Sequence, residues 1–424
     1  MLIHVVKSGE TLFKIANLYG VSTAAIINVN ELSMPNRLVI GLALVIPTGD
    51  AYHTVRSGET LWSIAQAYGS SVQAILRVNE IANPSLIYPG MVLRIPSRPR
   101  PVIDVNGYVY NLGERAARSV REVGEYLTYV CPFAYRIKED GDLETIDDNP
   151  AINAAYSVDA VPLMAITNFT STELGENLAH AVLSNLQIVN RLLTNIVNIM
   201  RRKGYLGLNI DFENVLPEDR ENYNRFIRLA VERLHPLGYS VSSALAPKTS
   251  AEQTGLLYTA HDYPTHGRIL DFIVLMTYEW GYRLSPPRAI SPLNLIKQVL
   301  DYAVSVIPRN KLFFGFQIYA RDWLLPHVQG QEAETFSNKE AVERAIRNGA
   351  VINYDTVAQS PWYRYTDAQG RRHEVWFEDA RSAQAKFDTV KAYGLRGISY
   401  WALGPAFPEN WALLGDNFTI RKRI

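Results

Sequence analysis

The chain has 424 residues, a length at which a single hydrophobic core is uncommon, so more than one domain is expected. Its 42 Lys and Arg balance its 42 Asp and Glu, so no net charge favours binding to nucleic acid or to an acidic membrane surface. Hydrophobic residues make up 47% and charged residues 20%, which is ordinary for a soluble globular protein.

The N-terminus shows no secretory signal peptide. Its first residues, MLIHVVK, lack a basic segment followed by a long apolar stretch. No window in the chain has the run of apolar residues that a membrane-spanning helix requires. We therefore expect a protein that is made in the cytoplasm and that reaches any site outside it by another route or after lysis.

An internal repeat fills the first hundred residues. The segment HVVKSGETLF, which begins at position 4, returns as HTVRSGETLW at position 53. In each copy a short strand leads through a Ser-Gly turn to Thr11 or Thr60, which stand where a helix N-cap belongs. Apolar residues at helical spacing follow, then a second helix and a closing strand. The pattern predicts two small strand–helix–helix–strand (βααβ) units, at 1–48 and 52–97.

Both units resemble the LysM module, through the opening V-x-SGETL, the central V-N-E and the closing V-I-P or R-I-P. LysM modules bind glycans that contain N-acetylglucosamine, chiefly peptidoglycan and chitin, and two weak sites on one polymer reinforce each other. The resemblance places the groove beside the Ser-Gly-Glu-Thr turn and the loop before the last strand, although these residues could equally serve only to hold a miniature fold together. The expected groove residues are Gly9, Thr11, Leu12 and Ile40 in the first unit, and Gly58, Thr60, Leu61 and Ile87 in the second.

A Pro-rich, charged stretch at 98–104 predicts a stiff linker. Beyond it, apolar strand-like runs alternate with helical stretches through 105–424, which predicts a (β/α)8 TIM barrel of parallel strands. Residues 324–377 interrupt the alternation and predict a small inserted α+β lobe beside the barrel mouth. The predicted strands are 107–112, 127–137, 161–169, 207–215, 239–248, 271–280, 311–323 and 397–404, and the helices include 177–202 and 218–235.

The fourth predicted strand, whose residues 205–213 read YLGLNIDFE, carries three polar side chains in alternation. Because side chains alternate along a strand, Asn209, Asp211 and Glu213 face one side with Gly207, and the Leu, Leu, Ile and Phe between them face the other. The apolar set should pack on the helices, which turns Glu213 toward the C-terminal barrel end, where barrel enzymes keep their active sites. Burying three polar groups is costly unless they bond to one another or to a ligand, so we expect a functional site.

This strand resembles the signature of glycoside hydrolase family 18, D-G-x-D-x-D-x-E. Gly207, Asp211 and Glu213 match it, whereas Leu206 and Asn209 stand where the family has aspartate. Further stretches that match family patterns are FAY at 133–135, MTYE at 276–279 and SYWALG at 399–404.

The resemblance implies a retaining, substrate-assisted hydrolysis that needs neither a protein nucleophile nor a metal or cofactor. Glu213 would protonate the glycosidic oxygen while the substrate's own 2-acetamido group attacks the anomeric carbon. Asp211 would orient the acetamido N–H, Tyr278 would steady its oxygen, and Trp401 would lie beneath the distorted sugar. Asn209 cannot titrate, so we expect Asp211 to bond to Asn209 and Glu213 and to raise the pKa of Glu213 by its like charge.

Three further residues are candidates for the pocket or the core. Met276 and Tyr135 fall within the matching motifs, and either could equally be ordinary core. Cys131, the one cysteine, reads as a small buried residue because no His or Asn motif near it suggests activation. The 8 His form no ligand-spaced cluster, so no metal is expected.

Two LysM-like modules, this strand and the missing signal peptide together resemble the spore cortex-lytic enzymes of endospore-forming bacteria. That resemblance implies an N-acetylglucosaminidase that acts on spore cortex peptidoglycan and lies in the coat or cortex. In the muramic-δ-lactam of cortex the 2-nitrogen is locked in a ring, so cleavage after N-acetylglucosamine fits the chemistry. Two alternatives stay open, a chitinase and a catalytically inactive barrel that serves as a lectin or coat scaffold. Endo or exo cleavage and any oligomeric state are compatible with the sequence.

Overall fold

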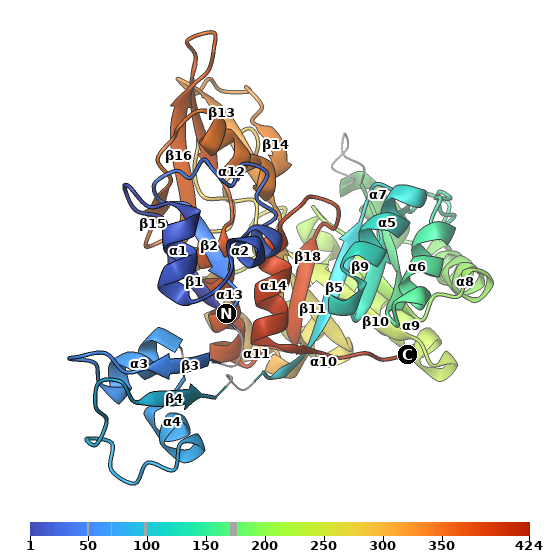
Figure 1. Cartoon of the computed structure of the whole chain (residues 1–424). Helices are drawn as coiled ribbons and strands as arrows, with labels where there is room; N and C mark the ends of the chain where they lie inside the picture. Colours follow the sequence, from blue (N-terminus) through green and yellow to red (C-terminus); the bar gives the residue numbers. More distant parts are fainter. Residues whose placement is uncertain (49–50, 69, 97–99, 170–175) are drawn as a thin grey trace.

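The computed structural model describes residues 1–48, 51–68, 70–96, 100–169 and 176–424. Within them, eight parallel strands close into a barrel, which confirms the predicted TIM barrel (Figure 1). Closure comes from β18 (Gly397–Trp401), which pairs with β5 (Val102–Val109) on one side and with β12 (Leu312–Gln317) on the other. The strands that complete the ring are β11 (Phe272–Leu275), β10 (Ser240–Leu245), β9 (Gly207–Asp211), β8 (Val161–Thr167) and β6 (Tyr129–Pro132).

Helices surround the barrel. The predicted helix 177–202 is two helices, because the Asn185 side chain accepts hydrogen bonds from the N–H groups of Gln187 and Ile188 and so starts a new helix. No single described helix is long and apolar enough to cross a membrane, and one pair, 12–19 with 23–30, passes that test only jointly across a bend of 106°. The barrel helices are α5 (Glu114–Glu122), α6 (Asn149–Ser157), α7 (Glu176–Leu183), α8 (Leu186–Lys203), α9 (Arg220–Leu234), α10 (Tyr263–Ile269), α11 (Leu293–Val306), α13 (Ala380–Tyr393) and α14 (Pro408–Asn417).

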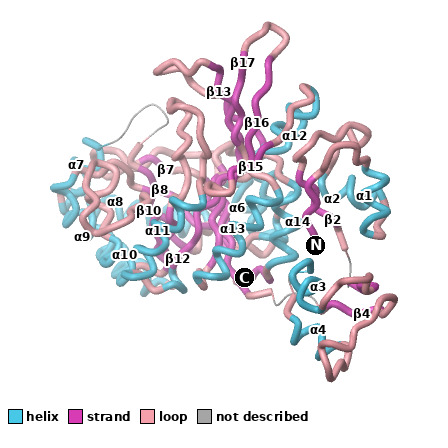
Figure 2. The backbone as a smooth tube through the Cα atoms, turned by 90° about the vertical axis from the view of Figure 1, so that its left-hand side faces the viewer, coloured by secondary structure: helices cyan, strands magenta, loops and turns pink. Residues whose placement is uncertain are grey.

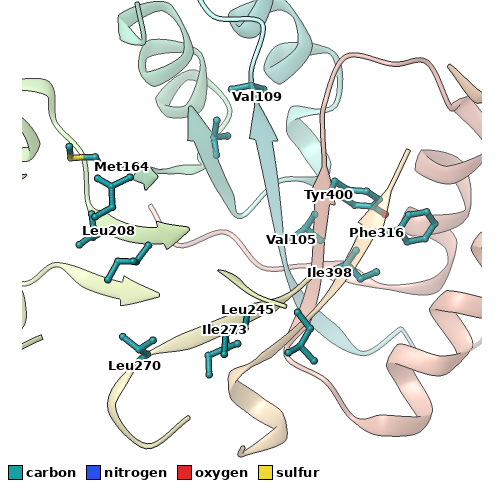
Figure 3. Close-up of a cluster of buried hydrophobic side chains, with 14 of the residues drawn as sticks. Val105, Val109, Met164, Leu208, Leu245, Leu270, Ile273, Phe316, Ile398 and Tyr400 are labelled. Atoms are coloured by element: carbon teal, nitrogen blue, oxygen red, sulfur yellow. The ribbon is translucent and has the colours of Figure 1, made fainter. Parts of the chain in front are cut away.

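The alternation of side chains along the strands divides the apolar residues into an outer and an inner set. The outer set, part of which Figure 3 shows, fills the space between strands and helices and includes Val105, Leu208 and Ile398. The inner set lies inside the barrel and includes Leu163 and Phe313. Leu206 was expected to pack on the helices with the other apolar residues of this strand, but it precedes β9 and packs on the inner set. The polar residues of β9 therefore face the barrel interior, as predicted.

The first barrel strand begins at Val102, not at residue 107, and so includes the end of the predicted linker 98–104. The sequence pattern missed this start because Asp104 places a charge inside the strand. That carboxylate is fully buried, and its Oδ2 accepts hydrogen bonds from Arg396 Nε at 2.9 Å and Arg423 Nη2 at 2.7 Å. The pairing compensates the buried charge. Linker residues 98 and 99 lie outside the described residues.

The lobe inserted after β12 is a five-stranded antiparallel sheet with one helix, α12 (Asn338–Arg347), and it rises above the barrel mouth (Figures 1 and 2). Its sheet begins at Tyr319, so the predicted strand 311–323 is two strands, one in the barrel and one in the lobe. One residue, Ile318, separates them, and so short a gap does not show in the sequence pattern. In spatial order the strands are β14 (Glu334–Ser337), β13 (Tyr319–Leu325), β17 (Arg372–Trp376), β16 (Ser360–Thr366) and β15 (Asn353–Asp355).

The two N-terminal units have the predicted strand–helix–helix–strand order, each with one antiparallel strand pair. Thr11 caps the first helix by accepting a hydrogen bond from Lys14 N, and Thr60 accepts one from Ser63 N. The units consist of β1 (Leu2–Val5), α1 (Leu12–Tyr19), α2 (Thr23–Asn30) and β2 (Ala43–Ile46), and of β3 (Ala51–Thr54), α3 (Leu61–Tyr68), α4 (Val72–Val78) and β4 (Val92–Ile95).

The first unit packs against the lobe, and the second stands apart from it (Figures 1 and 2). Leu12 of the first unit shares one hydrophobic cluster with Ala345 and Ile352 of the lobe. The backbone joins the two bodies as well, because Ile352 N donates to the Ile40 carbonyl at 2.9 Å. Among the described residues, the apolar cluster of the second unit contains residues of that unit alone.

Candidate active site

A pocket of about 190 Å³ opens at the C-terminal ends of the barrel strands. Asp211 ends β9, and Glu213 follows two residues later. The segment after β11 adds Met276 and Tyr278, and Trp401 ends β18. The structure thus brings these five predicted residues together. The residues that line the pocket are Phe133, Phe169, Asp211, Glu213, Ala246, Pro247, Leu257, Met276, Tyr278, Glu279 and Trp401.

Asp211 is a buried carboxyl group with an unused acceptor. Its side chain is 5% exposed, and its Oδ1 has no hydrogen-bond partner among the described residues. Burial, followed by the charge of Glu213, raises the pKa of Asp211 well above its ordinary range. A buried polar oxygen without a partner is costly, so this position favours a ligand that donates a hydrogen bond.

Glu213 lies just past the end of β9, where the barrel ladder no longer holds the chain. Asn168, at the end of β8, replaces the ladder: its Oδ1 accepts from Glu213 N at 2.9 Å, and its Nδ2 donates to the Glu213 carbonyl at 2.8 Å. Burial, and then the charge of Glu279, raises the pKa of Glu213 to about 7. The pKa is raised as expected, but Glu279 supplies the like charge that the sequence assigned to Asp211. A carboxyl group with this pKa can give and take a proton near neutral pH.

Glu279 is a functional candidate that the sequence argument did not select. Arg321 holds its carboxylate in a two-pronged ion pair, with Nη1 to Oε2 at 2.9 Å and Nη2 to Oε1 at 2.9 Å, and Tyr319 donates its hydroxyl to Oε1 as well. Both partners lie on β13 of the lobe, which the sequence pattern did not separate from the barrel. The signal available was the position of Glu279 directly after Tyr278 in the MTYE motif.

Tyr278 lines the same pocket as the carboxyl groups of Asp211 and Glu213. Burial, with the nearby charges of Asp211 and Glu213, raises its pKa well above its ordinary value. The phenol therefore keeps its proton and can donate a hydrogen bond to an oxygen held in the pocket.

Asn209 is not bonded to Asp211, contrary to the expectation. Its Oδ1 accepts from the Tyr108 hydroxyl at 2.8 Å, and its Nδ2 donates to Ser242 Oγ at 3.0 Å. No hydrogen bond joins Asn209 to Asp211 in the part of the chain that the structure describes. Residues two apart on a strand stand about 7 Å from each other. Ser242 is the register partner of Asn209 on the neighbouring strand β10, and Tyr108 reaches Asn209 from β5, which is not adjacent to β9 in the barrel. Asn209 thus belongs to a polar layer beneath the pocket.

Tyr135 lies outside the pocket, which corrects its assignment as a possible substrate contact. Its ring is 1% exposed, and its hydroxyl donates to the Asp148 carboxylate, which also accepts from the Tyr205 hydroxyl at 2.5 Å. The chain leaves β6 at Pro132 and starts a short strand, β7 (Tyr135–Arg136), so the alternation that would place Tyr135 beside Phe133 is broken. Phe133 takes the place in the pocket, with its ring centre 4.8 Å from that of Trp401 and the two ring planes at 84°.

The expected groove residues of the two small units divide into buried and exposed members. Leu12 is 7% exposed and Leu61 3% exposed, so both belong to the cores of their units. The exposed members gather at the turn between the first strand and the first helix, and they are Gly9, Thr11, Gly58 and Thr60.

Ile40 and Ile87 are not equivalent positions. Gly41 and Gly90 fix the alignment, because each donates its N–H to the carbonyl of the valine that follows the first strand. Ile40 precedes Gly41 directly, whereas Ile87 lies three residues before Gly90 and corresponds to Leu38. The Ile40 side chain is 45% exposed while its carbonyl accepts from Ile352 of the lobe.

Cys131 is buried inside the barrel, as predicted. Its Sγ donates to Asn106 Oδ1 at 3.2 Å, and burial raises the pKa of the thiol far above its ordinary value, so the thiol is unreactive. Across the described ranges, no group of three or more His, Cys, Asp or Glu side chains could hold a metal ion.

Comparisons with known proteins give the family. The pattern of glycosyl hydrolases family 18 matches residues 163–405, and the LysM domain matches residues 4–47 and 53–96. The cortical fragment-lytic enzyme of Bacillus subtilis (strain 168) is 49% identical over 100% of this chain and 99% of the relative. The enzyme of that name from Bacillus cereus is 44% identical over 99% and 98%.

Solved structures give the same picture. The spore cortex-lytic enzyme SleL of Bacillus megaterium QM B1551 has a TM-score of 0.90 at 39% identity, covering 100% of this chain and 99% of that one. A chitinase from Chromobacterium violaceum ATCC 12472 has a TM-score of 0.68 at 25% identity, covering 74% and 98%. This chain is therefore a glycoside hydrolase that belongs to glycosyl hydrolases family 18 and carries two LysM domains.

Proposed function

We propose that this glycoside hydrolase cleaves the β-1,4 bond after N-acetylglucosamine in spore cortex peptidoglycan during germination, by a substrate-assisted, retaining reaction. The observation that carries the proposal is the protonation and pairing of the three carboxyl groups that line the pocket. Asp211 and Glu213 both have raised pKa values, and Glu279 is bound to Arg321.

None of the three acids that line the described pocket is suited to attack a sugar carbon. Glu213, with a pKa of about 7, is a proton donor at neutral pH. Asp211 resists ionisation because it is buried beside Glu213, and a protonated carboxyl is a poor nucleophile. Glu279 is occupied by two hydrogen bonds from Arg321. The attacking oxygen then comes from the substrate's own 2-acetamido group, as in the exceptions to the two-carboxylate scheme.

Each pocket residue then has a defined role. Glu213 protonates the glycosidic oxygen, and the acetamido carbonyl closes on the anomeric carbon to form an oxazolinium ion. Asp211 accepts the acetamido N–H, which supplies the missing partner of its Oδ1, and Tyr278 donates to the acetamido oxygen. Glu213, now ionised, takes a proton from the water that opens the ring. Trp401 forms the floor, and Met276 packs against the sugar.

The reaction requires a free 2-acetamido group on the sugar that is attacked, which N-acetylglucosamine has and muramic-δ-lactam lacks. The relatives named cortical fragment-lytic enzyme support the cortex as the substrate. The two LysM domains, with their groove at Gly9, Thr11, Gly58 and Thr60, would bind the same polymer and hold the enzyme at the spore cortex or coat. Asn209 would act indirectly, by fixing the polar layer under Asp211.

A digest of spore cortex peptidoglycan tests the proposal. Mass spectrometry should find muropeptides with N-acetylglucosamine at the reducing end, and proton NMR should show the β-anomer first. Glu213→Gln should abolish turnover and leave polymer binding intact. A muramic acid reducing end, or undiminished turnover in Glu213→Gln, would refute the assignment.

A chitinase is the second candidate, which the likeness to the Chromobacterium violaceum chitinase favours. Chito-oligomers released from an N-acetylglucosamine homopolymer, faster than fragments from cortex, would support it. A barrel that binds both polymers and cuts neither would instead be a lectin or coat scaffold.

A further inference from the structure

A second, larger cavity adjoins the catalytic pocket. It has a volume of about 720 Å³, and Glu279 and Trp401 line both spaces. One wall is helix α5, and the opposite wall is the lobe, with Arg321 of β13. A polymer that crosses Trp401 therefore continues into this cavity on one side.

The floor of the cavity extends the aromatic floor of the pocket. Tyr110 stacks on Trp401 with ring centres 6.0 Å apart and planes 30° from parallel, and Tyr110 is 48% exposed. An exposed ring in line with Trp401 offers a face for a second sugar. The volume lies in the range of small-molecule sites, about 300–1,000 Å³.

The cavity holds an excess of unpaired positive charge. Arg321 is neutralised by Glu279. Arg115 and Arg118 are exposed, and their guanidinium groups form no ion pair or hydrogen bond with any described residue. Glu122 is the other acid on the wall, and it lies outside ion-pair distance of both arginines.

Helix α5 holds the two arginines over the cavity. They are three residues apart, so they lie on the same side of the helix. The opposite side carries Ala116, Ala117 and Val120, which are buried against the barrel. Because that packing fixes the rotation of the helix, the arginines remain directed to the cavity side.

We propose that Arg115 and Arg118 form a carboxylate-binding subsite that recognises the acidic substituents of peptidoglycan beside the sugar that is cleaved. This inference rests on the proposed function. Chitin is uncharged along its whole length, whereas peptidoglycan carries carboxylates on the lactyl group of muramic acid or on its peptide. A guanidinium matches a carboxylate with two parallel hydrogen bonds. The subsite thus gives the enzyme a physical means to prefer peptidoglycan over chitin.

The test compares Arg115→Gln/Arg118→Gln with Arg121→Gln, a control on the same helix whose guanidinium lies 4.0 Å from Glu114 and does not line the cavity. Three glycans of equal length serve as substrates: peptidoglycan fragments with peptides, the same fragments after an amidase has freed the lactyl carboxylates, and a neutral chito-oligosaccharide. We expect the double variant to raise KM about tenfold for an acidic glycan with unchanged kcat, and the control to match the wild type.

The pattern of effects identifies the source of the carboxylate. A raised KM for the peptide-bearing fragments alone assigns the peptide, and a raised KM for the amidase-treated fragments alone assigns the lactyl group. Equal KM changes for all three glycans, or no change, would overturn the subsite. Should the wild type cut neither peptidoglycan substrate, the proposed function fails. Calorimetric binding of the same fragments to wild type and double variant then decides the subsite by itself, with equal affinities overturning it.

Discussion

Replacing Glu213 with Gln should inactivate the enzyme and at the same time stabilise the fold at alkaline pH. The pocket raises the pKa of this carboxyl from its ordinary 4.5 to about 7. Ionising Glu213 in the folded protein therefore costs on the order of 3 kcal/mol more than ionising it in the unfolded chain. Glutamine has nearly the same shape and never ionises, so it removes this cost.

The sign of the effect depends on pH. Below pH 4.5 both states of the wild type hold the proton, and the variant gains nothing. Between pH 4.5 and about 7 only the folded state still holds it, so the wild type loses stability as the pH rises. Above about 7 the full difference is present, and Glu213→Gln should then melt roughly 5 °C higher than the wild type.

Differential scanning calorimetry of the full chain at pH 4.5 and pH 8.5 measures this difference. Glu139→Gln is the matched control, because Glu139 is an exposed glutamate in a loop and its replacement should shift neither melting temperature. A gain in melting temperature for Glu213→Gln that is equal at both pH values would mean that the pocket does not disfavour the ionised form of Glu213. A loss of stability at pH 8.5 would contradict the reasoning outright.

Three further changes test other parts of the structure. Glu279→Gln removes the like charge beside Glu213 and so should lower the pKa of the catalytic acid. The alkaline limb of the kcat/KM profile, where Glu213 loses its proton, should then move about one pH unit lower. An alkaline limb at the wild-type pH would contradict this. Tyr135→Phe should lower the free energy of unfolding in urea by about 1 kcal/mol and change kcat less than about twofold; a large fall in kcat would return Tyr135 to the site. Gly41→Ala should free the first LysM domain, because the new Cβ would lie 1.9 Å from a lobe carbonyl oxygen. Gly90 has a similar positive φ, but a Cβ added there, in Gly90→Ala, meets nothing within 4 Å. Limited proteolysis should cleave only the first variant faster, and equal rates would contradict the docking.

The barrel was predictable because its strands are apolar runs separated by helices, and the exceptions have local causes. Asp104 hides the start of β5, since the arginines that neutralise it come from the far end of the chain. The boundary between β12 and β13 was missed because a single residue, Ile318, separates the two strands, and β13 pairs with β17, which lies much later in the chain. Both errors arise where the partner that decides the structure is distant in sequence.

In the active site, too, residues fixed by local sequence were predictable and residues fixed by distant partners were not. Asp211 and Glu213 could be placed from the alternation of a single strand, which is local information. The pair formed by Glu279 and Arg321 could not, since it joins the segment after β11 to a strand of the lobe. Tyr135 was misplaced because a short irregular stretch after β6 ends the alternation on which its assignment depended.

The two LysM domains look equivalent in sequence, yet two aligned positions in the closing strand distinguish the docked domain from the one that stands apart. Val45 of the first domain is buried in the barrel's main hydrophobic cluster together with Ala43. Their counterparts in the second domain are Arg94 and Val92, and Val92 is 57% exposed. An arginine at the position of Val45 could not enter an apolar cluster without a partner for its charge. The closing motifs V-I-P and R-I-P therefore differ at the residue that is buried against the barrel in the first domain and exposed in the second. The two repeats keep the residues of their own cores and differ where one of them meets the rest of the protein.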